Sequence, residues 1–81
     1  MARKSEISPK LSKLLGRISS NIERLRQKNG WTQADTAERV DGDLRWYQRL
    51  ESGKHVLSLE TLTRLTQVFR VDVSEFFKTE P

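Results

Sequence analysis

Hydrophobic residues recur through most of the chain at the three- and four-residue spacing of an α-helix, and the alternation typical of strands is absent. The first stripe follows the pair Ser8-Pro9, in which the serine suits an N-cap and the proline suits the first helical position. Its members are Leu11, Leu14, Leu15, Ile18, Ile22 and Leu25. The pair Asn29-Gly30 is a typical stop signal, so a long first helix is predicted, with a break or frayed region expected near Gly16.

Two short helices joined by a tight turn are predicted next. Thr32 suits the N-cap of the first of them, and Asp43, which ends the turn Asp41-Gly42-Asp43, suits the N-cap of the second. The inner face of the first helix is formed by Gln33, Thr36, Ala37 and Val40. The second helix has two faces, one with Tyr47, Leu50 and Glu51 and the other with Leu44, Arg45, Gln48 and Arg49.

Two further helices complete the pattern. Ser58 caps a fourth helix, whose stripe is Leu59, Leu62, Leu65 and Phe69. Asp72 caps a short fifth helix that Phe76 and Phe77 close, and Glu75 is placed to complete a capping box. Because the connections are short, the five helices are expected to pack as one compact all-α bundle. We place this domain at residues 11–81, after a basic, flexible arm at residues 1–10.

Composition narrows the class of protein. A chain of 81 residues allows one domain, and its lack of cysteine excludes disulfides and zinc-finger sites. No apolar run reaches the length of a membrane span, and the N-terminus lacks the apolar segment of a signal peptide, so a cytoplasmic protein is expected. Residues 1–28 hold eight Lys or Arg against two acids, a net of +6, whereas residues 29–81 hold seven against nine, a net of −2. This basic half suggests a polyanionic partner.

The outer face of the third helix suits DNA recognition. Arg45, Gln48 and Arg49 are long side chains with several hydrogen-bond donors. Arginine can bridge O6 and N7 of guanine, and glutamine can bridge N6 and N7 of adenine. The pattern alone also fits an ordinary solvated helix face, so it leaves both interpretations open.

The order of short motifs from about Ile18 to Phe77 resembles the lambda-repressor/Cro-like (XRE-type) helix-turn-helix family of small bacterial transcription regulators. The motifs are Ile22-x-x-Leu25-Arg26, Gly30-Trp31-Thr32-Gln33, Ala37-Glu38, Leu50-Glu51-Ser52-Gly53-Lys54, Ser58-Leu59-Glu60-Thr61-Leu62 and Val71-Asp72-Val73-Ser74-Glu75-Phe76-Phe77. Each motif is weak alone, but the ordered set covers about three quarters of the chain. The resemblance places the helix-turn-helix at about residues 32–51, with a recognition helix at about 43–51.

The resemblance also implies roles for individual residues. The base-reading positions are Leu44, Arg45, Gln48 and Arg49. The positions that we expect to contact phosphate are Thr32, Gln33, Trp46, Lys54 and His55, and Gln33 is also expected to buttress the recognition helix. Arg26 and Glu51 match a pair that ties the first helix to the recognition helix; two independent surface charges are the alternative. Val73 and Phe77, with the end of the fourth helix, are our candidate dimer surface, because the chain has no separate oligomerisation domain.

Four positions depart from the family pattern. Thr36 replaces the usual leucine and is expected to weaken the core between the two short helices. Asp41 replaces the usual turn glycine but tolerates a left-handed conformation. Tyr47 replaces a smaller residue and is large enough for its hydroxyl to reach solvent. Leu44 replaces a polar reader and can touch only a thymine methyl group.

These features predict sequence-specific binding to double-stranded DNA by a transcription regulator, as a homodimer on a near-palindromic operator. RNA polymerase is a further partner that the family allows; no cofactor, metal, small-molecule ligand or membrane is expected. The main alternative is an antitoxin-like or antirepressor protein-interaction module with secondary DNA binding. A membrane-surface helix at residues 1–28 is disfavoured because its stripe continues into core positions. An enzyme is disfavoured because no nucleophile with an acid-base set is visible.

Overall fold

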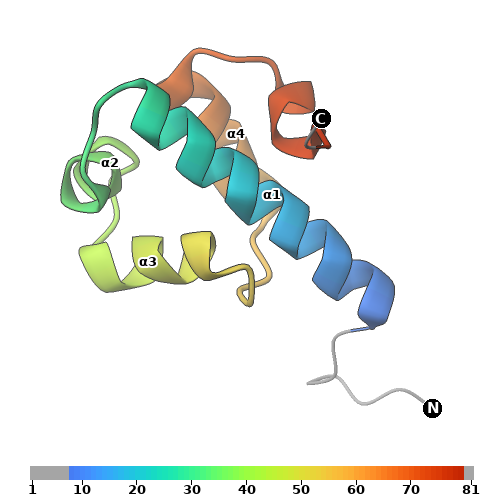
Figure 1. Cartoon of the computed structure of the whole chain (residues 1–81). Coiled ribbons are helices and arrows are strands. Elements are labelled where there is room, and N and C mark those ends of the chain that lie inside the picture. The colour runs from blue at the N-terminus through green and yellow to red at the C-terminus, as the bar shows by residue number, and fades with distance from the viewer. Residues whose placement is uncertain (1–7, 80–81) are drawn as a thin grey trace.

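The computed structural model of the chain describes residues 8–79 and contains only helices there (Figure 1). The elements in order are α1 (Pro9–Lys28), α2 (Gln33–Arg39), α3 (Leu44–Ser52), α4 (Leu59–Phe69) and the 3₁₀ helix η1 (Val73–Phe77). The all-α fold and the five elements are therefore confirmed in their predicted order. The fifth is a single 3₁₀ segment rather than an α-helix.

Side chains cap the start of every helix as the sequence predicts. Each cap accepts a hydrogen bond from a backbone N–H two or three residues further on, which satisfies one of the unpaired donors of the first turn. The caps are Ser8, Thr32, Asp43, Ser58 and Asp72. At α2 the cap is reciprocal, because the Asp35 carboxylate accepts from the Thr32 N–H at 3.0 Å. This bond lowers the pKa of Asp35.

Helix α1 begins at Pro9, as the Ser8-Pro9 pair predicts, but it differs from two other expectations. The helix runs through Gly16 without interruption, so the expected break is wrong; Leu15 and Ile18 on either side are buried and hold both turns against the bundle. Pro9 and Lys10, which we assigned to a basic arm, are the first residues of α1. The rest of that arm, residues 1–7 with Arg3 and Lys4, lies outside the described residues.

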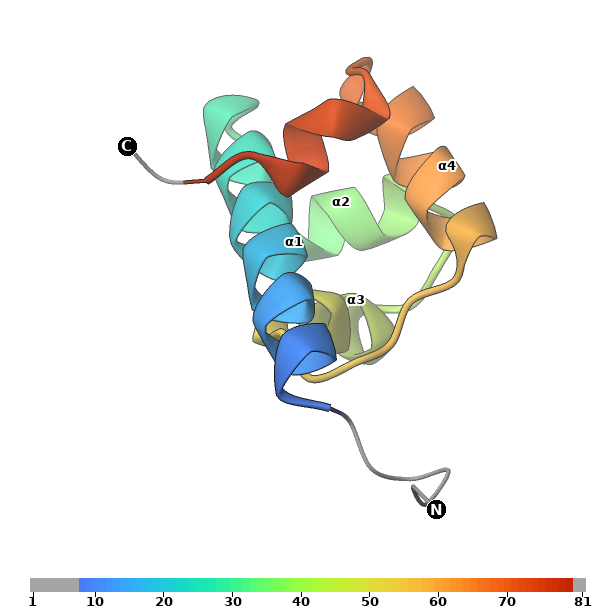
Figure 2. The same cartoon turned by 90° about the vertical axis from the view of Figure 1, so that its right-hand side faces the viewer.

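The core lies between α1 and the remaining helices. Figure 2 shows α1 and α4 on opposite sides of the molecule, with α2 between them and η1 crossing above. The buried cluster contains Ile18, Ile22, Leu25, Ala37, Val40, Tyr47, Leu50, Leu62, Leu65, Phe69 and Phe76. Three members of the predicted stripes are not buried. Leu11 is half-buried in the first turn of α1, Leu14 lies at the edge of its stripe and is 37% exposed, and Leu59 begins α4 and is 82% exposed.

A buried asparagine fastens the C-terminal segment to α1. Asn21 is 3% exposed, and its amide donates to the carbonyl oxygens of Phe76 at 3.0 Å and Lys78 at 2.9 Å. Its side-chain oxygen accepts from Arg24. Glu75 completes no capping box with Asp72; its carboxylate contacts Lys78 at 2.7 Å and Arg24 at 3.4 Å. The capping-box expectation is therefore wrong, because partners outside η1 take this carboxylate.

Candidate nucleic-acid interface

Helix α3 has the two faces that its sequence predicts. Tyr47 and Leu50 are buried at 0% and 3% exposure and anchor the helix in the core. The outward side chains are exposed, and they are Leu44, Arg45, Gln48 and Arg49. Figure 1 shows α3 at the lower edge of the molecule, with α1 and α2 on its upper side. The four side chains assigned to base reading are thus gathered on one uncovered face.

The turn between α2 and α3 uses an aspartate and a glycine for different reasons. Asp41 adopts the left-handed conformation with φ of 60°, as expected for the residue in the glycine position. Gly42 provides space instead: a Cβ there would lie 2.4 Å from a ring carbon of Trp46. The indole of Trp46 therefore packs on the turn and fixes the angle at which α3 leaves α2. A phosphate contact by Trp46 remains a prediction.

Arg26 of α1 and Glu51 of α3 lie in contact, as expected for a pair that ties these helices. The Arg26 Nε atom is 2.6 Å from Oε2 of Glu51, and its Nη2 atom is 3.3 Å from Oε1. The two side chains are only 13% and 5% exposed, respectively. Arg26 also donates to the Trp31 carbonyl oxygen at 3.0 Å, which holds the loop between α1 and α2. This two-point geometry is stronger and more directional than a single ion pair.

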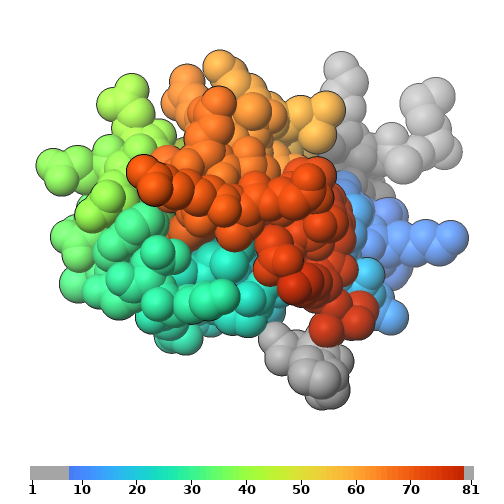
Figure 3. All heavy atoms as spheres, turned by 90° about the horizontal axis from the view of Figure 1, so that it is seen from above, coloured from blue at the N-terminus to red at the C-terminus, as the bar shows by residue number. Residues whose placement is uncertain are grey.

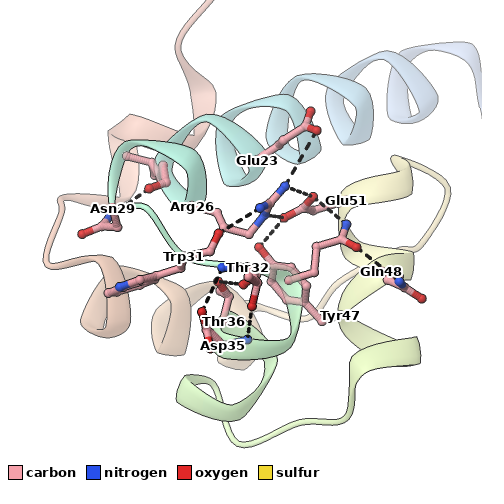
Figure 4. A network of polar contacts seen from close by, with 12 residues as sticks. Glu23, Arg26, Asn29, Trp31, Thr32, Asp35, Thr36, Tyr47, Gln48 and Glu51 are labelled. Carbon is pink, nitrogen blue, oxygen red and sulfur yellow. Dashed lines mark hydrogen bonds and ion pairs between the residues drawn. The ribbon is translucent and has the colours of Figure 1, made fainter.

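Glu51 accepts hydrogen bonds from α1, from α2 and from Tyr47 of its own helix α3 (Figure 4). The Tyr47 hydroxyl donates to Oε2 of Glu51, so the expectation that it reaches solvent is wrong; the whole side chain is buried. The Gln33 amide donates to Oε1 at 3.0 Å. Burial disfavours the charged form of Glu51, but the bonds from Arg26, Tyr47 and Gln33 outweigh it and lower the pKa of Glu51. Burial, with the bond to Glu51, raises the pKa of Tyr47.

Gln33 links the start of α2 to the exposed face of α3. Its side-chain oxygen accepts from the Gln48 amide at 3.2 Å, while its own amide donates to Glu51. This is the buttress that the family resemblance implies. Thr36 is wholly buried one turn later, and its hydroxyl donates to the Thr32 carbonyl oxygen at 2.9 Å. A threonine can occupy this interior position because its polar atom has a partner.

The other predicted phosphate contacts lie at the two ends of the helix-turn-helix. Thr32 is exposed at the start of α2, with its hydroxyl engaged as the cap. Lys54 is exposed and His55 half-buried in the loop after α3. Gly53 ends α3 with φ of 78°, and a Cβ there would lie 2.9 Å from the Ser19 hydroxyl oxygen. Because this loop approaches α1 closely at Gly53, the backbone position from which Lys54 and His55 extend is fixed.

Sequence reasoning missed two features that position this site. One is the contact between Trp46 and Gly42, and the other is the convergence of Tyr47 and Gln33 on Glu51. The spacing of Tyr47 and Glu51 by one helical turn could have indicated their bond. Over residues 8–79, no group of three or more His, Cys, Asp or Glu side chains could hold a metal ion. Within the same residues, no helix is long and apolar enough to cross a membrane.

A protein-family model described as a helix-turn-helix domain matches residues 18–76, which is more than half of the chain. Neither a curated protein nor a solved structure matches the chain. The matched segment contains all of α2, α3 and α4, and it leaves residues 9–17 of α1 upstream. Two short helices joined by a tight turn are the layout of this DNA-binding motif, in which the second helix enters the major groove.

Proposed function

Since the chain belongs to the helix-turn-helix domain family, we propose that it is a small transcription regulator that reads duplex DNA in the major groove with α3. Leu44, Arg45, Gln48 and Arg49 are the proposed base-reading residues. Arginine and glutamine make the bidentate contacts to guanine and adenine on which direct readout depends. Leu44, at 42% exposure, adds an apolar contact suited to a thymine methyl group.

The observation that supports this proposal most strongly is the network around Glu51. It ties α3 to α1 through Arg26 and to α2 through Gln33. Among the proposed base-reading side chains it includes Gln48, which donates to Gln33, but not Arg45 or Arg49. A recognition helix that is fixed before binding loses less conformational freedom when it enters the groove. Apart from Trp46, which lies in α3 itself, the phosphate contacts assigned above lie at the start of α2 and after α3, where they would set the register of α3 on the duplex.

A homodimer on a near-palindromic site is the second part of the proposal. Val73 and Phe77 are 44% and 39% exposed, which is high for apolar side chains of this size. Val73 also lines a shallow groove of about 260 Å³ between η1 and the exposed side of α4. Figure 3 shows this face, with α4 and η1 in orange to red across the centre of the view. A two-fold pair would double the few base pairs that one α3 can read.

Selection of bound sites from a random duplex library tests both parts. We expect the wild-type protein to enrich one motif, with two half-sites related by a two-fold axis. A variant with Arg45→Ala and Gln48→Ala should enrich a less defined motif. If the wild-type protein enriches no motif, sequence-specific binding is excluded; a single half-site without symmetry would exclude the homodimer.

A further inference from the structure

A row of cations runs along the side of α1 beside the C-terminal segment, where Arg17 and Arg24 are half-buried and the other members are exposed. Its members, which we call the α1 basic row, are Lys10, Lys13, Arg17, Arg24 and Lys28. They are three, four, seven and four residues apart, and these intervals fall on one side of a helix with 3.6 residues per turn. The row extends for about 27 Å at 1.5 Å per residue. Such a length suits a linear polyanion better than a compact anion.

The α1 basic row faces away from α3. Arg26 faces α3, because it binds Glu51 there, and Ser19 faces the C-terminal end of α3. These two residues follow Arg24 and Arg17 by two positions, which is about 200° around a helix. Figure 1 shows the same arrangement, with α3 on one side of α1 and the C-terminal segment on the other. A duplex held by α3 would therefore not meet the row.

A hollow of about 320 Å³ lies in the middle of the row. Its lining residues are Lys13, Gly16, Arg17, Ser20, Lys78 and Thr79. Gly16 leaves the hollow open, since a Cβ there would have no neighbour within 4 Å. Among residues 8–79, no carboxylate lies within 4.0 Å of the Lys13 or Arg17 cation, whereas Glu75 partly neutralises Lys78 and Arg24. Two cations and two hydroxyl groups offer hydrogen-bond donors to a phosphate group.

We propose that the α1 basic row binds the phosphate backbone of a second DNA duplex, so that one protein molecule can bridge two duplex segments. This inference rests on the proposed function, because α3 must hold the first duplex. Duplex DNA offers about one charge per 1.7 Å of its axis, which matches a long row without requiring a shaped pocket. Gly16, Ser20 and Gln27 flank the row on one side, and Leu14, 37% exposed, is its apolar neighbour between Lys10 and Arg17. A protein interface or a membrane-surface helix uses several such apolar anchors.

A capture assay tests the inference. The selected duplex is immobilised and saturated with protein, and a labelled duplex of unrelated sequence is then added. Wild-type protein should retain the labelled duplex, with salt-sensitive affinity. The variant K13Q/R17Q should still saturate the immobilised duplex. For the captured duplex, however, its slope of log affinity against log salt concentration should be smaller by about 2, which is the expected loss for two phosphate contacts. The control R39Q/R64Q removes the same charge from α2 and α4, away from the row and from the assigned DNA contacts, and should behave as wild type.

A second arm separates this inference from the proposed function. The variant R45A/Q48A/R49A is titrated with the unrelated duplex, with and without K13Q/R17Q. If this variant binds the unrelated duplex more weakly once K13Q/R17Q is added, the α1 basic row binds DNA. If the wild-type protein also shows no site preference, that result contradicts the proposed function. If the wild-type protein binds its selected site but captures no second duplex, only the inference about the α1 basic row is overturned. Equal loss of both duplexes with K13Q/R17Q also overturns it, and absence of all duplex binding overturns both.

Discussion

At the scale of single residues, the fold depends most on one buried carboxylate. Glu51 has hydrogen bonds from Arg26, Gln33 and Tyr47, which belong to three different helices. The contact between Arg26 and Glu51 could be expected from the family motifs. The bond from Tyr47 could not, because the direction of a tyrosine hydroxyl depends on how deeply its ring is packed. Here the ring is fully buried, and the hydroxyl meets Glu51 instead of water.

Loss of Arg26 should therefore be costly. We expect Arg26→Ala to lower the free energy of unfolding by about 3 kcal/mol, because it leaves Glu51 charged, 5% exposed and short of its main partner. Arg64→Ala is the matched control: Arg64 pairs with Glu60 at 3.5 Å on the surface of α4, where such pairs contribute about 0.5 kcal/mol. Denaturant titrations give both values. Equal losses in the two variants would show that the pair contributes no more than a surface contact.

The Glu51 network should also contribute to stability in acid. The pKa of Glu51 is lowered from 4.5 on folding, so its stabilising effect is complete above pH 4.5 and is lost as the pH falls through the folded-state pKa. We expect Glu51→Gln to be less stable than wild type at pH 7 and the difference to narrow below pH 4.5. The free energy of unfolding of both proteins, measured from pH 7 to pH 3, tests this. Parallel curves would contradict it.

At the scale of helices, the sequence predicts where each helix starts better than it predicts which side chains the helix contacts. The five caps could be identified in the sequence because each acts on a backbone N–H two or three residues away. The failures involve partners outside the first turn of the helix concerned. Glu75 was expected to bond within its own turn, but Arg24 and Lys78 take its carboxylate. The expected break at Gly16 does not occur, because packing of its neighbours outweighs the low helix propensity of one glycine.

Two glycines should respond to alanine in opposite directions. At Gly42 a Cβ would overlap the Trp46 ring at 2.4 Å, so Gly42→Ala should destabilise the protein by about 1–3 kcal/mol by displacing α3. At Gly16, in an open part of α1, Gly16→Ala should stabilise it by about 0.5–1 kcal/mol. Neither glycine has a positive φ. Melting temperatures compare the variants directly, and a Gly42→Ala protein that melts at or above the wild-type temperature would refute the role assigned to Gly42.

At the scale of the whole molecule, the fold could be predicted from the sequence more fully than the placement of the charged side chains on its surface. Helical periodicity and the ordered motifs were enough to predict the bundle, and the family match covers residues 18–76. The excess of cations in residues 1–28 was visible in the sequence, but the side of the folded domain on which these cations lie was not. Only the contacts of Arg26 with Glu51 and of Arg24 with Glu75 show that the α1 basic row faces away from α3 and lies beside the C-terminal segment.

The central claim is that α3 reads the base sequence, and titration of the selected duplex against a scrambled one, at one fixed salt concentration, tests it most directly. Arg45→Ala or Gln48→Ala should weaken binding to the selected duplex by about 1–3 kcal/mol and leave binding to the scrambled duplex nearly unchanged. Lys54→Ala should weaken both alike, as expected for a phosphate contact. Equal loss of both duplexes in the Arg45 and Gln48 variants, with no relaxed base preference, would show that α3 does not read the sequence.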